Sequence, residues 1–273
     1  MSQAKPESIP TVKIGVTEIP TVLLGTSPFF GSAGFGAEKS KQYRERFLTR
    51  SGEIVDIIVE SLRNGAGGVQ TIAPNAPITK ISGAPPLLEA LRQAERKIGS
   101  RLNCVATVFD EDGIELLSEF NNEIIMADGV VTDRVKLDEL FSLRDACKRH
   151  GLQFGLATHN PASVVPKLRQ NEELWKEVEL LACPINSRGY YMNGLVDRAS
   201  QENRNRALET LRQSGKPVLA IKMLAAGRMR LEEGCSFAMK IPFVKAFAVG
   251  VGSVEEARQT FSLLRKLQAP GES

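Results

Sequence analysis

The chain has 273 residues, of which 42% are hydrophobic and 25% are charged, close to the average of soluble globular proteins. This composition excludes a disordered chain, a collagen-like chain and a membrane bundle, and no apolar run reaches the roughly 18 residues that a membrane-spanning helix needs. The 35 basic and 32 acidic residues interleave, which argues against nucleic-acid binding. The first ten residues contain no apolar signal segment, so we expect a cytoplasmic protein that binds neither nucleic acid nor membranes.

Four cysteines stand at positions 104, 147, 183 and 235, and no pair of them has the C-x-x-C spacing of a zinc clip. Without a signal segment, we expect these thiols to be reduced. Cys104 and Cys183 lie inside apolar runs and are interpreted as small core residues. The sequence therefore predicts neither disulfides nor a metal site.

Apolar runs alternate with helical segments along nearly the whole chain. The runs are almost continuously apolar, as the strands of a buried parallel sheet are. Eight of them are predicted strands: 21–25, 68–72, 103–109, 124–131, 153–158, 180–185, 217–224 and 246–251. Helices are predicted between them at 52–64, 85–98, 113–120, 136–150, 161–169 with 172–179, 202–214 and 254–267, and at most a short helix at 232–240.

Eight β/α units in a chain of this length predict an α/β protein with one domain, a (β/α)8 TIM barrel. We expect the barrel to span residues 11–267, between flexible ends at 1–10 and 268–273. A doubly wound sheet is the alternative, but segment 25–31 after the first predicted strand lacks the G-x-G-x-x-G spacing of a dinucleotide-binding turn. The glycine-rich segment 31–36 is interpreted as a mobile loop that leads into a polar stretch.

Lys222 stands inside the apolar run 218–224, at the predicted C-terminal end of the seventh strand, where barrel enzymes carry their chemistry. Burial disfavours an ammonium and lowers its pKa, the condition for a general-base or Schiff-base lysine. The alternative is a paired lysine that holds a loop or a substrate carboxylate.

Two further residues are candidates for acid–base work. His159 directly follows the fifth strand, and imidazole titrates near neutral pH. Asp110 follows the third strand, although it also begins a turn that is typical of helix capping. Asp128 and Asp133 are further carboxylates near the predicted mouth of the barrel.

The loops after strands seven and eight predict an anion site, because these loops and a helix N-terminus commonly bind phosphate in barrels. Gly227 and Arg228 follow strand seven, and Gly252 and Ser253 follow strand eight. Close packing between helix and strand could also require these glycines. Polar residues at other strand ends are candidates to contact the substrate: Thr26, Asn186 and Tyr190.

Several of these segments together resemble the aldo/keto reductase superfamily. The similar stretches are an N-terminal hairpin and first strand, and the ends of strands five to eight, at 12–29, 155–160, 184–188, 220–228 and 250–256. The resemblance implies a barrel that binds NADP(H). It would place Asn160 near the nicotinamide amide and Gly227, Gly252 and Ser253 near the phosphates.

The family's catalytic tetrad of Asp, Tyr, Lys and His is not matched. The strand-two motif contains neither Asp nor Tyr at 70–75, the strand-three lysine is missing around 106–108, and the strand-four histidine is missing from 125–129. The family's hydride-transfer mechanism therefore cannot be carried over to this chain.

The sequence thus predicts an aldo/keto reductase-like barrel enzyme that acts on a phosphorylated or carbonyl small molecule by non-redox, lyase or isomerase chemistry. An NADP(H)-dependent oxidoreductase in which Tyr190 or Tyr191 donates the proton is one alternative. A non-catalytic binding or assembly protein is another. The cofactor stays open, with NADP as a candidate, and the chain can be an oligomer.

Overall fold

The structure, a computed structural model, describes residues 10–31, 33–77, 79, 83, 85–194 and 199–268. Eight parallel strands close into a barrel in the order β10-β3-β4-β5-β6-β7-β8-β9. The predicted single-domain (β/α)8 barrel is confirmed. The strands are β3 (Val22–Gly25), β4 (Gly68–Ile72), β5 (Asn103–Val108), β6 (Asn121–Ala127), β7 (Gln153–Ala157), β8 (Val178–Pro184), β9 (Val218–Ile221) and β10 (Val244–Gly250).

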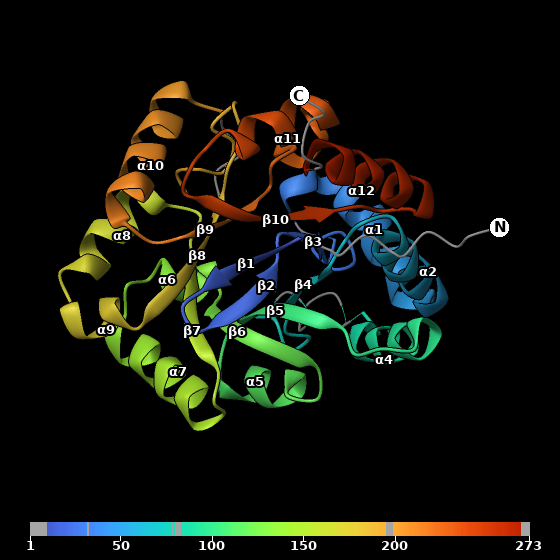
Figure 1. The fold of residues 1–273 in the computed structure, drawn as a ribbon, viewed down its shortest axis with the longest axis horizontal. Helices are drawn as coiled ribbons and strands as arrows, with labels where there is room; N and C mark the ends of the chain where they lie inside the picture. Colours follow the sequence, from blue (N-terminus) through green and yellow to red (C-terminus); the bar gives the residue numbers. More distant parts are fainter. Residues whose placement is uncertain are drawn as a thin grey trace.

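Helices surround the barrel, and Figure 1 looks into the ring from one end. The helices are α1 (Ala37–Thr49), α2 (Ser51–Arg63), α4 (Leu87–Ile98), α5 (Glu111–Leu117), α6 (Gly129–Thr132), α7 (Leu137–Arg149), α8 (Pro161–Arg169), α9 (Glu172–Lys176), α10 (Gln201–Ser214), α11 (Leu231–Met239) and α12 (Val254–Gln268). Two 3₁₀ turns, η1 (Ala33–Phe35) and η2 (Ala225–Gly227), lie in loops at the mouth. The expected flexible segments 1–10 and 268–273 lie outside the described residues, apart from Pro10 and Gln268.

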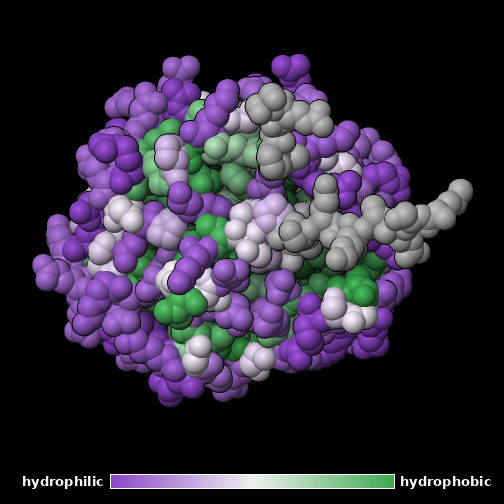
Figure 2. Space-filling model, viewed as in Figure 1, coloured by the Kyte–Doolittle hydropathy of each residue, from purple (hydrophilic) through white to green (hydrophobic). Residues whose placement is uncertain are grey.

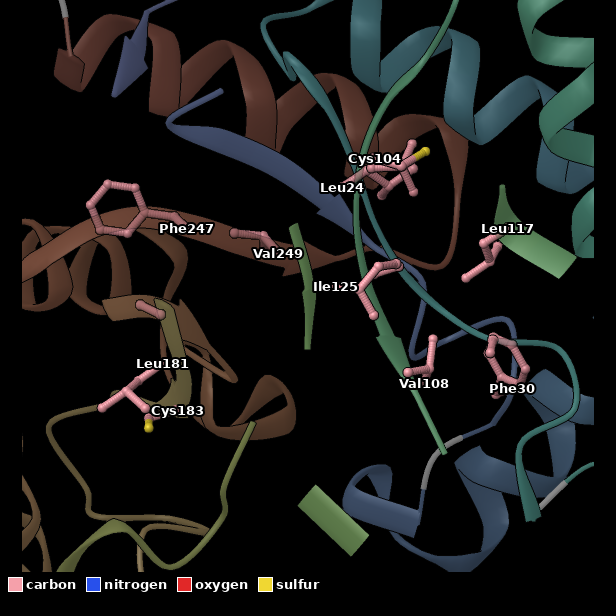
Figure 3. Packing of buried hydrophobic residues seen from close by; sticks show 14 of the residues in the cluster. Leu24, Phe30, Cys104, Val108, Leu117, Ile125, Leu181, Cys183, Phe247 and Val249 are labelled. Carbon is pink, nitrogen blue, oxygen red and sulfur yellow. The ribbon is translucent and has the colours of Figure 1, made fainter. Parts of the chain in front are cut away.

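The strands alternate between two hydrophobic cores. On β6, Ile124 and Met126 face the barrel interior, whereas Ile125 packs against the helices. Figure 3 shows part of the outer core, which includes Leu24 from β3 and Cys104 from β5. Both faces of the sheet are therefore buried, which explains why the strands are continuously apolar in sequence.

An N-terminal hairpin covers one end of the barrel. Strands β1 (Thr11–Ile14) and β2 (Thr17–Pro20) pair antiparallel and lie across the front of the ring in Figure 1. Ile14 and Ile19 are buried with the interior residue Leu23. The hairpin thus forms a floor at the N-terminal ends of the strands, opposite the end where barrel chemistry occurs.

Two predicted strands end earlier than the sequence indicated. The run at 124–131 ends as β6 at Ala127, because the Asp128 side chain accepts a hydrogen bond from the Val130 amide and begins α6. The run at 217–224 ends as β9 at Ile221, because Lys222 adopts a left-handed backbone with φ of 53°. Both corrections place a polar residue at the mouth.

The segment after the first strand is also corrected. The predicted mobile loop at 31–36 includes η1, and the polar stretch behind it forms α1. Helix α1 packs through Tyr43 and Phe47, one turn apart. Because Phe47 makes an edge-to-face contact with Phe29, at 5.1 Å between ring centroids, α1 is held against the first loop of the barrel.

The surface of the face seen in Figure 2 is dominated by hydrophilic residues. In the described part of the chain, no helix is long and apolar enough to cross a membrane. The four cysteines are free and buried, and the interpretation of Cys104 and Cys183 as core residues is confirmed.

Candidate active site

A cavity of about 300 Å³ opens at the C-terminal ends of the strands. It lies between the ends of β9 and β10 on one side and η1, α1 and α12 on the other. Its volume is at the lower end of the range for small-molecule sites. Its lining includes Ser27, Phe35, Lys39, Tyr43, Gln70, Ile221, Lys222, Met223, Leu224, Gly227, Met229, Leu231, Val249, Val251 and Glu256.

Lys222 reaches this cavity because its backbone breaks the strand alternation. Leu219 and Ile221 face the barrel interior, so a regular strand would turn Lys222 towards the helices. Its left-handed φ of 53° redirects the half-buried side chain to the cavity. Burial lowers the pKa of the Lys222 amine, and the negative charge of Asp128 only partly opposes this effect.

Backbone strain is concentrated around this lysine. Five non-glycine residues in the described ranges have a left-handed φ, and four of them belong to the two loops beside the cavity: Tyr191, Lys222, Ala225 and Ala226. Such a conformation costs about 1–3 kcal/mol per residue and persists where the surrounding structure enforces it. Tyr191 packs with Ala225 in a small buried cluster, and the Lys222 Nζ lies 5.6 Å from the centroid of the Tyr191 ring.

Asp128 contributes a carboxyl group to the same end of the barrel. Its pKa is raised by burial, against the lowering effects of the Val130 amide and the positive charge of Lys222. Burial therefore favours the uncharged form of both Asp128 and Lys222. Among the described residues, no carboxylate lies within 4.0 Å of the Lys222 amine.

His159 is held neutral. Burial lowers its pKa to about 3, and the positive charge of Lys222 adds to this effect. Its backbone amide donates to Asp133 at 3.3 Å, while its Nδ1 atom is buried without a hydrogen-bond partner in the described structure. The Oδ1 atom of the adjacent Asn160 is also buried without one. Two uncharged polar side chains therefore follow β7.

Asn186 and Tyr190, which the sequence suggested for substrate contact, instead hold the loops together. The Asn186 Nδ2 donates to the backbone oxygens of Tyr190 at 3.0 Å and Lys222 at 3.3 Å, and its Oδ1 accepts from the Tyr190 amide. The Tyr190 hydroxyl donates to the Gly34 carbonyl at 3.0 Å. Neither side chain lines the cavity.

Thr26 and Asp110 are likewise placed away from the cavity. The buried Thr26 hydroxyl accepts from the Ile72 amide and joins the ends of two strands. The exposed Asp110 caps α5 by accepting from the Gly113 amide, and it accepts a second hydrogen bond from Asn75. The catalytic assignment of Asp110 therefore has no geometric support, because capping explains the residue.

The predicted anion site is already satisfied by the protein. The Gly252 amide donates to the Glu256 carboxylate at 2.7 Å, and the Ser253 hydroxyl accepts from the Glu256 amide at 3.1 Å. This reciprocal pattern is a capping box at the start of α12. A Cβ atom at Gly252 would lie 2.7 Å from the nearest ring carbon of Tyr43, so this glycine is explained by close packing.

NADP(H), which the family resemblance implies, does not fit the residues present. Of the five residues expected to bind it, only Gly227 lines the cavity. Arg228 stacks on the Tyr190 ring, at 4.4 Å from its centroid, and donates to the Ala225 carbonyl. An anion at Gly252 would meet the Glu256 carboxylate.

Sequence reasoning missed several residues that shape the cavity. Phe35 and Tyr43 line it, and Glu256 lies at its outer rim. The four-residue spacing of Tyr43 and Phe47 was the available signal for α1. The Ser-x-x-Glu pattern at Ser253 was the signal for a capping box instead of an anion site.

No protein-family model and no curated protein sequence matches the chain. Solved structures with a similar fold include two proteins from Pseudomonas aeruginosa that are provisionally named aldo-keto reductases. The first is 17% identical with a TM-score of 0.61, over 94% of this chain and 95% of that one. The second is 16% identical with a TM-score of 0.59, over 94% of both chains.

A third similar structure is an N-acetylneuraminic acid (sialic acid) synthetase from Leptospira borgpetersenii. It is 14% identical with a TM-score of 0.54, over 96% of this chain and 91% of that one. Likeness at these identities concerns the fold. The resemblance found in the sequence is confirmed at that level: the chain has the fold of a divergent aldo/keto reductase-like (β/α)8 barrel.

Proposed function

We propose that the chain is an enzyme that acts on a small carbonyl compound by non-redox chemistry, with the Lys222 amine as nucleophile. The observation that carries this proposal is the amine itself. It faces a cavity at the mouth, and burial lowers its pKa without a carboxylate at ion-pair distance in the described structure. A neutral amine in a pocket is the form that attacks carbonyl carbon.

In the proposed reaction, the Lys222 nitrogen forms a bond to the carbonyl carbon of the substrate. The carbonyl oxygen takes up one proton from the Lys222 nitrogen and one from an acid and leaves as water, so that amine, carbonyl and acid give a protonated imine, one water molecule and the conjugate base of the acid. Asp128, whose pKa is raised by burial, supplies a proton to this oxygen. The protonated imine then accepts the electron pair released when a neighbouring C–H or C–C bond breaks, which is isomerase or lyase chemistry.

His159 has a supporting role in this proposal. With a pKa lowered to about 3, it does not add a second positive charge beside the protonated imine. An uncharged imidazole can still orient a substrate oxygen by a hydrogen bond. Three titratable groups with shifted pKa values follow β6, β7 and β9 at the same end of the barrel, and this favours an enzyme over a non-catalytic barrel, although only Lys222 lines the cavity.

The alternative of a relocated tyrosine acid is less well supported. The Tyr190 hydroxyl already donates to a backbone carbonyl, and neither Tyr190 nor Tyr191 lines the cavity. Both rings are buried against each other, at 4.4 Å between centroids. A tyrosine acid would therefore require both loops to rearrange.

Reductive trapping tests the proposal. The protein is incubated with small aldehydes and ketones and sodium cyanoborohydride, and the modified lysine is identified by peptide mass mapping. We expect modification at Lys222 first and its loss in Lys222→Arg. Lys216→Arg is the matched control, since burial also lowers the pKa of Lys216 while this residue lines a different groove. Equal modification of wild type and Lys222→Arg would refute the role of Lys222.

A further inference from the structure

The geometry points to an uncharged carbonyl compound with an apolar body as the substrate, not a phosphorylated one. This inference rests on the proposed role of Lys222 and adds the chemistry of the rest of the molecule. It is carried by the part of the cavity beyond the lysine, which lies between the loop after β9 and α12.

The walls beyond Lys222 are apolar. They are formed by side chains from η1, from the loop after β9, and from the ends of α11 and β10: Phe35, Leu224, Met229, Leu231, Val249 and Val251. An apolar group placed there leaves water, which favours binding in proportion to the area buried. A phosphate would lose its hydration there without gaining a charged partner.

The outer rim offers no net positive charge to a phosphate. The Glu256 carboxylate already accepts a hydrogen bond from the Gly252 amide, and its negative charge repels a second anion at this helix N-terminus. The rim cation Lys39 lies 5.3 Å from the centroid of the Tyr43 ring, and Glu256 adds one negative charge to the same cavity lining. Arg228, the residue expected to bind the phosphate, stacks on Tyr190 outside the cavity lining.

The inner end supplies the polar contacts that a carbonyl needs. Ser27 and Gln70 line the cavity together with Lys222. The Gln70 side chain is buried, and its Nε2 donates to the Thr71 carbonyl at 3.1 Å. The cavity is thus polar at the amine and apolar beyond it, which suits a molecule with one polar end.

Competitive trapping with cyanoborohydride tests this inference. Hexanal, glyceraldehyde and glyceraldehyde 3-phosphate are compared by the aldehyde concentration that half-saturates the label on Lys222. We expect hexanal to act at a concentration lower than the phosphate by about tenfold or more, as burial of several methylene groups implies. A preference for the phosphate would overturn the inference and leave the role of Lys222 intact. No label on Lys222 from any aldehyde would overturn both.

Two variants make the test specific to the cavity walls. Leu231→Gln should raise the half-saturating hexanal concentration about tenfold, because it places an amide in the apolar wall. Leu208→Gln is the matched control, a half-buried leucine on α10 outside the cavity, and should leave it unchanged. Glu256→Gln should improve labelling by the phosphate relative to hexanal. Equal effects of both leucine variants, or no effect of Glu256→Gln, would overturn the inference.

Discussion

Asn186 is bonded to the backbone of Lys222 across two neighbouring strand ends. Its Nδ2 donates to the Lys222 carbonyl at 3.3 Å, and the same amide group bonds both the amide and the carbonyl of Tyr190. Asn186 is fully buried. It therefore fixes the left-handed backbone of Lys222 relative to the loop after β8, and we regard it as a positioning residue.

Asn186→Ala should destabilise the fold by about 1–3 kcal/mol, because it leaves buried backbone groups of Tyr190 and Lys222 without their partner. Urea denaturation measures the change. Asn205→Ala is the control: Asn205 is exposed and bonded to the neighbouring Arg204, so its loss should change stability by less than about 0.5 kcal/mol. The rate of reductive labelling of Lys222 should fall in Asn186→Ala and should stay at the wild-type value in Asn205→Ala. Similar stability of both variants would contradict the positioning role.

Lys222→Met should be more stable than wild type at neutral pH. The folded-state pKa of Lys222 lies below its unfolded value of 10.5, so at neutral pH the unfolded chain keeps a solvated ammonium, whereas the native state must either bury this charge or give up the proton, and both lower its stability. As pH rises through the folded pKa towards 10.5, the native state loses its proton first and this cost disappears. The stability difference, measured by urea denaturation at pH 7 and pH 10, should shrink. Lys245→Met, at an exposed position, is the control. A constant difference would show that burial does not shift the amine.

The stability of the wild type should fall as the pH drops from 6.5 towards 3, with His159 as a contributor. The folded-state pKa of His159 is about 3, below its unfolded value of 6.5, so the unfolded state takes up the proton first in this window. One such group contributes a slope of up to about 1.4 kcal/mol per pH unit. His159→Gln should show a shallower slope between pH 6.5 and 5 than wild type, whereas His150→Gln should not. Identical slopes in all three proteins would show that His159 titrates normally.

Ser253→Ala should destabilise the protein by about 0.5–2 kcal/mol, because it removes the N-cap of α12. Thermal or urea denaturation reports this change. Ser163→Ala, inside α8, is the control and should be nearly neutral, since alanine is the better helix former. If Ser253→Ala left stability unchanged but weakened a phosphorylated ligand, Ser253 would belong to an anion site after all.

NADPH should not be consumed with a panel of aldehydes. In the described structure, the tyrosine that lines the cavity, Tyr43, comes from α1 and not from the end of β4, and Glu256 accepts the hydrogen bond of the amide that a cofactor phosphate would need. Positioned acid–base catalysis contributes about 10²–10⁴ to a rate, so only background reduction is expected. The double variant Tyr190→Phe/Tyr191→Phe distinguishes reduction catalysed by a relocated tyrosine acid from background reduction. Robust turnover in wild type that vanishes in this variant would establish the oxidoreductase alternative.

Much of the fold could be predicted because strands that are buried on both faces of the sheet are recognisable in the sequence as apolar runs. Runs such as 68–72 and 153–158 are largely apolar and contain no charged residue, and their positions match β4 and β7 within one residue. Helix α1 could not be recognised in the same way. It buries only Ser40, Tyr43 and Phe47, and the remainder of its surface is polar.

The site was predictable only in part, because the sequence locates the ends of the strands but not the tertiary contacts that the side chains make there. Lys222 stood out as a charge in an apolar run, and it does line the cavity. Asp110 and Asp128 both follow strands, and the sequence analysis preferred Asp110 as the catalytic carboxylate. The difference is tertiary: Asp110 is exposed and caps α5, whereas Asp128 is half-buried and interacts electrostatically with Lys222. Likewise, Glu256 reaches back to the Gly252 amide only in the folded capping box.

The hairpin that covers the N-terminal end of the barrel has a kinetic consequence. Because Ile14 and Ile19 pack into the interior core, the cavity has its opening at the opposite end. Substrate and product must then use the same passage, beside α1 and α12. A product that lingers there blocks the next substrate, so inhibition by product should be competitive with respect to substrate.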